Sequence, residues 1–430
     1  MLTGDRGRIA GNAVWLLAER GVTLACQLVV SIALARYLGP SEFGVYSLAL
    51  ALATFALTFS SLGLNHTLTR EIVVAPAATP SILATAIELR FIGSVVGAIA
   101  VVVVARVVYP QLETLGAMAV ALSVGILVRS LDALEFYFHA RLRGRTLVTT
   151  RGVAAVTSAA AVLGAIQFGA GAGTFAAIKS AEFSLAAILL LVAFRFRPDS
   201  PGFAAPTMAH ARSLLTKSWP LMLSSVGAII YLKIDQAMLA AMSGPEAVGI
   251  YSVAAQLSEV WYFVPVAVAT SAFPALLQAR MSGTGSYEAR LQRLYDFVAM
   301  LGLVSAAVIS WLSPWLIDLL YGPRFTGAAA VLSLHVWASV FVFMRAVLSK
   351  WLIAEELYIF SLVTHGAGAI ANVALNYVLI PIYGPVGAAG ATVISYSVAS
   401  YGALFLHPRT RPAGWMMTRA MIAPIRYLFR

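Results

Sequence analysis

The sequence is poor in charge and almost free of cysteine. Of its 430 residues only 11% are charged and 60% are hydrophobic, and the mean hydropathy is +0.86. A soluble domain carries about 25% charged residues, so an ordinary soluble fold is excluded. The single cysteine, Cys26, cannot form a disulfide within the chain.

Motifs of catalysis and of nucleotide binding are also missing. The patterns HExxH, GxSxG and GxxxxGK[ST] do not occur, and the six histidines show no metal-ligand spacing. We therefore expect no enzyme activity, no metal site and no cofactor. Because there is no ATP site, any pumping has to use an ion gradient or the membrane potential. The net charge of +11 is typical of loops facing anionic lipid in a membrane protein, so no nucleic-acid partner is expected.

Apolar segments of the length needed to cross a bilayer recur along the whole chain. They predict an all-α polytopic membrane protein with about twelve transmembrane helices. No small-residue cleavage site follows the first segment, so we expect it to be a retained span. The predicted spans are 13–35, 43–64, 82–105, 113–137, 147–168, 174–194, 217–242, 247–274, 293–320, 327–350, 356–380 and 386–406.

A repeated turn organises these spans. The stretch RYLGPSEFGVYSLA at 36–49 returns as GPEAVGIYSVA at 244–254, a shift of 205 residues from Gly39 to Gly244. Gly and Pro stop one helix, and a second Gly allows close approach where the next helix begins. Fainter copies occur at Gly169–Thr174, Tyr321–Gly327 and Tyr383–Gly390.

The repeat predicts a duplicated bundle of helical hairpins, an arrangement that is common in transporters. The expected parts are an N-terminal six-helix lobe at 1–200, a cytoplasmic linker at 201–216, a C-terminal six-helix lobe at 217–406 and a basic tail at 407–430. The tail fits either an amphipathic segment in the inner interface or a frayed, solvated end.

Basic residues are distributed unevenly among the connectors. Those after odd-numbered spans carry only Arg36, Arg106 and Arg324, whereas those after even-numbered spans, with both termini, carry about twenty basic residues. Positively charged loops remain on the cytoplasmic side of a membrane. The asymmetry predicts that both termini are cytoplasmic and that the Gly-Pro turns face outward.

Ionisable residues inside the spans carry most of the functional signal. Such a group costs at least about 2.5–3.5 kcal/mol near the bilayer centre, so it normally faces a partner or a water-filled cavity. Basic residues match acidic ones in number here, and a central cavity lined by Arg and Lys suits an anionic, phosphate-bearing substrate. The predicted substrate-binding residues are Arg20, Arg90, Lys233 and Arg345.

Carboxylates beside these cations are predicted to take up the coupling ion, a proton or sodium. The expected residues are Asp235, Glu259 and Glu19, and Glu259 has no opposite charge within a turn of its own helix. Other interpretations stay open. Arg20 and Arg345 are close enough to the cytoplasm to snorkel, and the i,i+3 pairs Arg129–Asp132 and Lys179–Glu182 could be neutralised structural pairs.

Three segments resemble a known family. They are ALARYLGPSEFGVYSLALALATFALTFSSLGLNHTLTREI at 33–72, YLKIDQAMLAAMSGPEAVGIYSVAAQLSEV at 231–260 and NYVLIPIYGPVGAAGATVISYSV at 376–398. Together they resemble bacterial polysaccharide-biosynthesis flippases, the Wzx-like branch of the multidrug/oligosaccharidyl-lipid/polysaccharide exporter superfamily. By position, Lys233 and Asp235 match the family's polar motif in span seven, and Arg20 matches a basic residue common in its first span.

The resemblance implies a flippase that moves undecaprenyl-diphosphate-linked oligosaccharide across the cytoplasmic (inner) membrane, for a surface polymer such as O-antigen or exopolysaccharide. It implies two six-helix lobes around a V-shaped cavity with alternating access. Membrane lipids and the polysaccharide polymerase and chain-length machinery are expected partners.

Two other classes remain open. An ion-coupled multidrug or small-molecule exporter of the same superfamily would share the fold but favour an acid-rich cavity. An integral membrane enzyme or assembly scaffold would need a long outward loop with paired carboxylates or histidines, and the predicted connectors offer none.

Overall fold

The computed structural model describes residues 2–281 and 286–428, without the side chains of 2–14, 16–20, 66, 286, 358, 427 and 428. Every regular element in these ranges is a helix, which confirms the predicted all-α class. Ten segments of the described chain are long and apolar enough to cross a membrane. Two of them, Gly21–Ser60 and Ile359–Leu406, are interrupted by a non-helical glycine and so hold two spans each, which agrees with about twelve.

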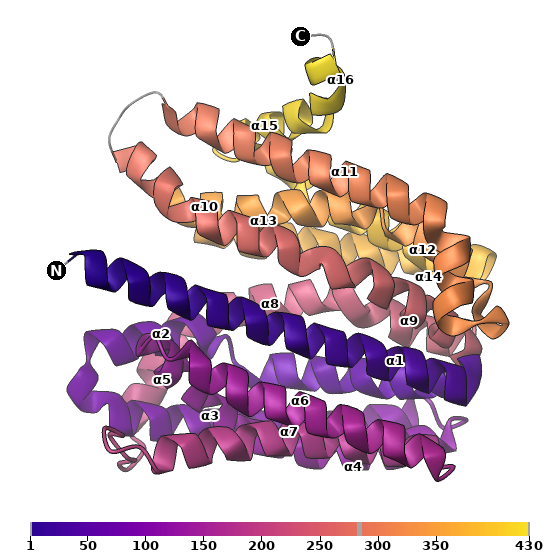
Figure 1. The fold of residues 1–430 in the computed structure, drawn as a ribbon, viewed down its shortest axis with the longest axis horizontal. Helices are drawn as coiled ribbons and strands as arrows, with labels where there is room; N and C mark the ends of the chain where they lie inside the picture. Colours follow the sequence, from indigo (N-terminus) through magenta and orange to yellow (C-terminus); the bar gives the residue numbers. More distant parts are fainter. Residues whose placement is uncertain (1, 282–285, 429–430) are drawn as a thin grey trace. The chain divides into compact units, whose positions relative to one another are not determined.

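The described chain divides into two compact units, Met1–Val226 and Gly227–Arg430, and the border lies inside helix α8 (Met208–Met242). The first unit contains α1 (Leu2–Ser60), α2 (Leu64–Val74), η1 (Pro76–Ala78), α3 (Thr79–Val107), α4 (Glu113–Val128), η2 (Arg129–Asp132), α5 (Ala133–Ala140), α6 (Gly144–Gln167) and α7 (Ala172–Arg195). The second contains α9 (Pro245–Glu259), η3 (Val260–Tyr262), α10 (Phe263–Met281), α11 (Ser286–Tyr321), η4 (Pro323–Phe325), α12 (Ala328–His335), α13 (Ala338–Ala354), α14 (Tyr358–Ser400), η5 (Gly402–Leu406), α15 (Arg411–Met421) and α16 (Ala423–Leu428). Figure 1 shows these helices in chain order.

Glycine-proline turns separate successive spans at the positions that the repeat predicts. Gly39 has φ 77° and ψ 174°, and Gly244 has φ 84° and ψ 175°, so the two copies share one backbone conformation. Gly322 and Gly384 also have positive φ, and each precedes a proline. Glycine tolerates this left-handed region, and proline fits the first turn of the helix that follows.

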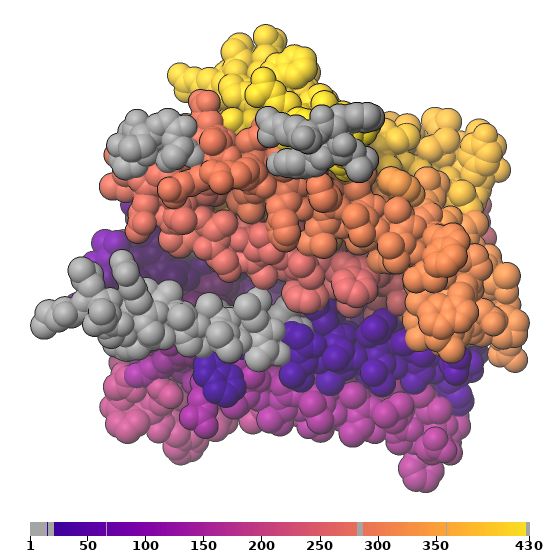
Figure 2. All heavy atoms as spheres, turned by 45° about the horizontal axis from the view of Figure 1, so that its top comes forward, coloured from indigo at the N-terminus to yellow at the C-terminus, as the bar shows by residue number. Residues whose placement is uncertain are grey.

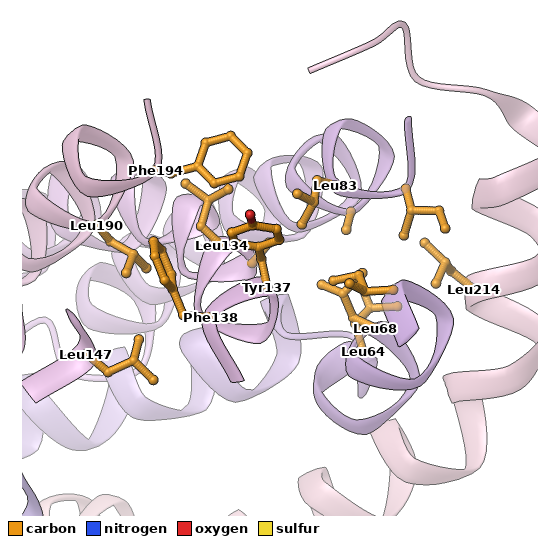
Figure 3. Close-up of a cluster of buried hydrophobic side chains, with 14 residues drawn as sticks. Leu64, Leu68, Leu83, Leu134, Tyr137, Phe138, Leu147, Leu190, Phe194 and Leu214 are labelled. Carbon is orange, nitrogen blue, oxygen red and sulfur yellow. The ribbon is translucent and has the colours of Figure 1, made fainter. Parts of the chain in front are cut away.

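A hydrophobic cluster of the first unit forms where α2 and α5 meet longer helices. Leu64 and Leu68 of α2 are fully buried, and so are Tyr137 and Phe138 of α5. Figure 3 shows these side chains in one cluster with residues of α3, α6, α7 and α8. Helix α2 is shorter than a span, so its role is to pack against this end of the unit.

The segment predicted as a linker is tied to the first unit. Ser81 donates a hydrogen bond to the carbonyl of Ala205 at 3.0 Å, and the Thr207 amide donates to the Thr85 hydroxyl at 3.1 Å. Arg143 forms an ion pair with Asp199, which lowers the pKa of that carboxyl. Residues 199–207 therefore follow the surface of one unit closely.

The predicted basic tail folds as two short helices within the second unit. Helix α15 lies along α11, as Figure 1 shows, and the yellow segment that contains α15 stands out on the surface in Figure 2. Gln292 donates to the carbonyl of Met416 at 3.0 Å, and Arg426 pairs with Asp296. The described part of the tail therefore packs against α11. Residues 429–430 lie outside the described residues.

Gly63, between α1 and α2, provides a stability test. It has φ 66°, and an added Cβ would lie 2.5 Å from the backbone nitrogen of Met222. We expect Gly63→Ala to destabilise the protein by about 1–3 kcal/mol, because the methyl group combines backbone strain with overpacking. A thermal unfolding scan of the purified protein in detergent measures this as a lower melting temperature.

Gly152→Ala is the matched control. Gly152 lies inside α6, and an added Cβ there meets nothing within 4 Å. Its melting temperature should be unchanged or slightly raised, because alanine favours helix over glycine. Equal melting temperatures for the two variants would contradict the close packing at Gly63.

Candidate functional site

A fully buried carboxylate lies at the centre of the second unit. Asp235 of α8 has 0% exposure. Tyr251 of α9 donates to its Oδ2 at 2.6 Å, and Thr392 of α14 donates to the same oxygen at 2.7 Å. Asn376 of α14 donates to Oδ1. No ion pair of Asp235 is found among the described residues, so neutral donors alone stabilise this carboxylate.

Two of the donors, Asn376 and Thr392, belong to a longer polar network on α14. The Nδ2 atom of Asn376 also donates to Oδ1 of Asn372 at 3.0 Å, and Asn372 donates to the Ser395 hydroxyl at 3.1 Å. The remaining oxygen of Asn376, Oδ1, is buried and has no hydrogen-bond partner within the described chain. A buried carboxylate with a free amide oxygen nearby is a set of ligands that suits a hard cation.

Lys233 and Glu259 form an ion pair between α8 and α9. The Lys233 ammonium lies 3.1 Å from Oε2 of Glu259, and the side chains are 24% and 25% exposed. Glu259 has no opposite charge on its own helix, but the neighbouring helix supplies one. The pair occurs where α9 ends and the 3₁₀ turn η3 begins. Lys233 and Asp235 are two residues apart on α8, so their side chains point in different directions. Lys233 contacts Glu259, whereas Asp235 accepts from Tyr251.

Arg345 of α13 is held by neutral groups. Its Nη1 donates to the Thr364 hydroxyl at 2.8 Å and to the Ala399 carbonyl at 3.0 Å. Its Nη2 lies 2.7 Å from Nε2 of His365, whose Nδ1 lies 2.8 Å from the Tyr231 hydroxyl. Since arginine is only a donor, Nε2 accepts and Nδ1 carries the proton. Within the described ranges no carboxylate pairs with Arg345, so its positive charge is uncompensated.

In the first unit, Arg90 of α3 is buried with 8% exposure, and its guanidinium carbon lies 5.9 Å from the centre of the Phe136 ring. Its Nη1 atom has no hydrogen-bond partner in the described part of the chain. Nearby carboxylates pair with other cations: Asp132 with Arg129 at 2.7 Å, and Glu135 with Arg151 at 2.5 Å. The second predicted structural pair, Lys179–Glu182, is also formed, at 2.7 Å.

The structure brings together only part of the predicted set. Lys233, Asp235 and Glu259 are grouped on α8 and α9, whereas Arg345 lies in a separate cluster of the same unit. The side chains of Glu19 and Arg20 lie outside the described residues, so these two stay predictions. The sequence did not identify the neutral side chains that surround these charges, because their only signal was a polar residue within an apolar span. The neutral side chains are Tyr231, Tyr251, His365, Asn372, Asn376 and Thr392.

The arrangement of helices is that of a known class of transporter. A solved structure of the lipid II flippase MurJ, in an inward closed conformation, matches with a TM-score of 0.70 and 15% identity, over 97% of this chain and 92% of that one. An inward-facing multidrug resistance MATE transporter matches with a TM-score of 0.71 and 14% identity, over 96% and 99%. At these identities the likeness concerns the fold alone. The protein is a multi-pass membrane protein with the fold of the MOP transporter superfamily.

Its family follows from the sequence match. The chain matches the family of polysaccharide biosynthesis proteins over residues 9–280, and it belongs to that family. It is also similar to two curated proteins of Haloferax volcanii. "Probable flippase AglR" is 28% identical over 212 residues, which is 48% of this chain and 44% of the relative. "Probable low-salt glycan biosynthesis flippase Agl15" is 24% identical over 215 residues, or 50% and 46%. Each match spans less than half of the relative.

The Lys233–Glu259 pair can be tested by a double-mutant cycle. Lys233→Met and Glu259→Gln should each lower the melting temperature, because each leaves a half-buried polar partner unpaired. The double variant should recover part of the loss, corresponding to a coupling of about 0.5–3 kcal/mol. Thermal unfolding of the four proteins in one detergent gives the comparison.

Lys217 and Glu71 provide a matched control cycle. They form an ion pair at 2.9 Å within the first unit, but the Lys217 side chain is 47% exposed. Exposed pairs contribute about 0.2–1 kcal/mol, so this cycle should show the weaker coupling. A coupling at Lys233 and Glu259 no larger than the control would show that their contact contributes no more than an exposed ion pair.

Proposed function

We propose that this protein is a flippase that moves undecaprenyl-diphosphate-linked oligosaccharide across the cytoplasmic membrane for the synthesis of a surface polysaccharide. Its membership of the polysaccharide biosynthesis family supports this proposal. Two relatives carry flippase in their names, and one of these names mentions glycan biosynthesis. The MOP fold supplies a transporter scaffold for the activity.

The uncompensated charge of Arg345 is the observation that carries the proposal. Its described partners are the hydroxyls of Thr364 and Ser361, the His365 imidazole and the Ala399 carbonyl, so no described carboxylate offsets the charge of the guanidinium within its span. A diphosphate would supply the missing anion, and the guanidinium fork matches phosphate geometry. In the first unit, taken by itself, Arg90 has a buried donor without a described partner and is proposed as a separate contact for phosphate. Lys233 contributes less because Glu259 offsets its charge, and Arg20 is proposed from its position in the sequence.

Asp235 is proposed as the residue that couples transport to an ion gradient. A proton would neutralise the buried carboxylate, and a sodium ion would find oxygen ligands in Asp235, Thr392 and the free Oδ1 of Asn376. Either event changes the charge that connects α8, α9 and α14. Such a change biases the packing of these helices, as alternating access requires. Glu259 and Glu19 are the other proposed coupling carboxylates.

We also propose that both termini are cytoplasmic and that the protein works with the polymerase and chain-length proteins of its pathway. The distribution of basic connectors supports cytoplasmic termini, and the pathway's polymerase and chain-length proteins would receive the product. A multidrug exporter shares this fold. Arginines without a paired carboxylate favour an anionic substrate over a cationic drug.

The function can be tested by deleting the gene and complementing it with variants. Deletion should cause the full lipid-linked oligosaccharide to accumulate while surface polysaccharide is lost, because the block lies at membrane crossing. Arg345→Ala should fail to complement, and Arg345→Lys should complement in part, since lysine keeps the charge but not the fork. Lipid extracts analysed by mass spectrometry give the measurement, alongside the amount of surface polymer.

The alternative makes a different prediction for the same strain. If lipid-linked intermediates are unchanged by the deletion, and no second copy of the function compensates, the substrate is not this lipid. Sensitivity to cationic dyes would then identify an exporter. Immunoblots of membrane fractions ensure that each variant is present at the level of the unmodified protein.

Asp235→Asn tests ion coupling. The amide keeps the size of the carboxylate and can still accept from Tyr251 or Thr392, so the fold should be retained. Transport in vesicles should fall at least about tenfold and should no longer respond to an imposed proton or sodium gradient, because the amide has no charge to neutralise. Asp318→Asn is the control, since Asp318 is an exposed residue of α11. A gradient response retained by Asp235→Asn would remove Asp235 from the mechanism.

A further inference from the structure

A pocket of about 570 Å³ lies at the surface of the first unit, between α2 and α5. We call it the α2–α5 pocket. It is lined by Asn65, Thr69, Arg70, Val73, Val74, Phe136 and His139. Figure 1 shows the two helices beside one another. The volume falls within the range of about 300–1,000 Å³ of small-molecule sites and exceeds what a lone phosphate needs.

The wall of the pocket is the free side of an anchored helix. Leu64, Leu68 and Ile72 repeat every four residues and bury one side of α2 in the core. The pocket residues of α2 lie on its other side. Because the buried side fixes the helix, the pocket wall is a built surface and does not depend on a loose loop.

Polar and apolar side chains are graded along this wall. Asn65, Thr69 and Arg70 stand near the beginning and middle of α2, and the exposed Val73 and Val74 stand at its end. One end of the pocket therefore offers hydrogen-bond donors and a positive charge, and the other offers hydrocarbon. A ligand with an anionic head and an apolar chain satisfies both ends.

The nearby carboxylates do not neutralise Arg70. Glu71 is paired with Lys217 at 2.9 Å, and Glu135 accepts from Arg151 and contacts His139 at 3.2 Å. Among the residues with described side chains, none forms an ion pair with Arg70. The guanidinium is therefore free to meet an anion from outside the chain.

A second, buried cation lies behind the pocket. Arg90 has 8% exposure and lies over the ring of Phe136, which lines the pocket. Its Nη1 atom lacks a hydrogen-bond partner in the described chain. Asp132 and Glu135 act on this charge, but each is paired with another arginine, so Arg90 still adds to the positive potential of the pocket.

We propose that the α2–α5 pocket binds the phosphate group of a membrane lipid, with Arg70 and its polar neighbours on the phosphate and the hydrocarbon chain along Val73, Val74 and Phe136. The phosphate can come from a bilayer phospholipid or from a polyprenyl phosphate. The site goes beyond the proposed flippase function. Only binding of a polyprenyl phosphate would rest on that function. In the orientation predicted from the basic connectors, the pocket faces the cytoplasmic leaflet.

Native mass spectrometry of the purified full chain tests the proposal with four probes: phosphatidylglycerol, a C55 polyprenyl monophosphate, diacylglycerol and inorganic phosphate. We expect retention of one or both phosphorylated lipids, and much weaker retention of diacylglycerol and of phosphate alone. Arg70→Ala should reduce retention about tenfold, the effect of losing one charge-assisted hydrogen bond, and Arg70→Lys should restore part of it. Val73→Asp should also reduce it, because a carboxylate repels the phosphate.

Arg195→Ala is the matched control, since Arg195 is an exposed arginine of the same unit at the end of α7. If Arg70→Ala loses only phosphatidylglycerol, or only polyprenyl phosphate, the site is supported and the lost lipid is identified as the one that provides the phosphate. Equal retention of both lipids by Arg70→Ala, Val73→Asp and Arg195→Ala would overturn the proposal. Because binding is measured without transport, a failed flippase assay would leave this result unaffected.

Discussion

A carboxylate with no exposure to solvent connects three helices of the second unit. Asp235 on α8 receives hydrogen bonds from Tyr251 on α9 and from Asn376 and Thr392 on α14. A buried carboxylate without such donors would cost several kcal/mol, so the three helices have to present their polar groups together. This requirement fixes which face of each helix points inward. It also makes the packing sensitive to the charge of a single residue.

Much of the fold follows from local chemistry and could be predicted. The apolar length of each segment specifies a span, and the Gly-Pro pairs specify where a span ends. Gly39 and Gly244 adopt nearly the same backbone angles although 205 positions separate them (244 minus 39), because each is followed by a proline that starts the next helix. The faint copies at Gly322 and Gly384 have the same cause.

The contacts that define the candidate site could not be predicted in this way. Lys233 and Glu259 are 26 positions apart, and Asp235 and Thr392 are 157 apart, so their proximity depends on how helices pack. Hydropathy carries no information about such pairs. Helix α2 was missed for a related reason, because it is too short to register as a span, and the hydrophobic pattern left α15 open between an amphipathic segment and a frayed end; the stability of both comes from the surfaces on which they lie.

Charge compensation separates structural residues from functional candidates. Arg129, Lys179 and Lys233 each have a carboxylate within 3.1 Å, so the charge of each is offset by a neighbour in the same unit. Arg345 is bound only by neutral groups, and Arg90 keeps an unpaired donor. An unpaired cation in an apolar helix bundle destabilises the empty protein and is stabilised by any anion that binds to it. Arg345 and Arg90 are therefore the described positions at which a bound anion would relieve the largest electrostatic cost.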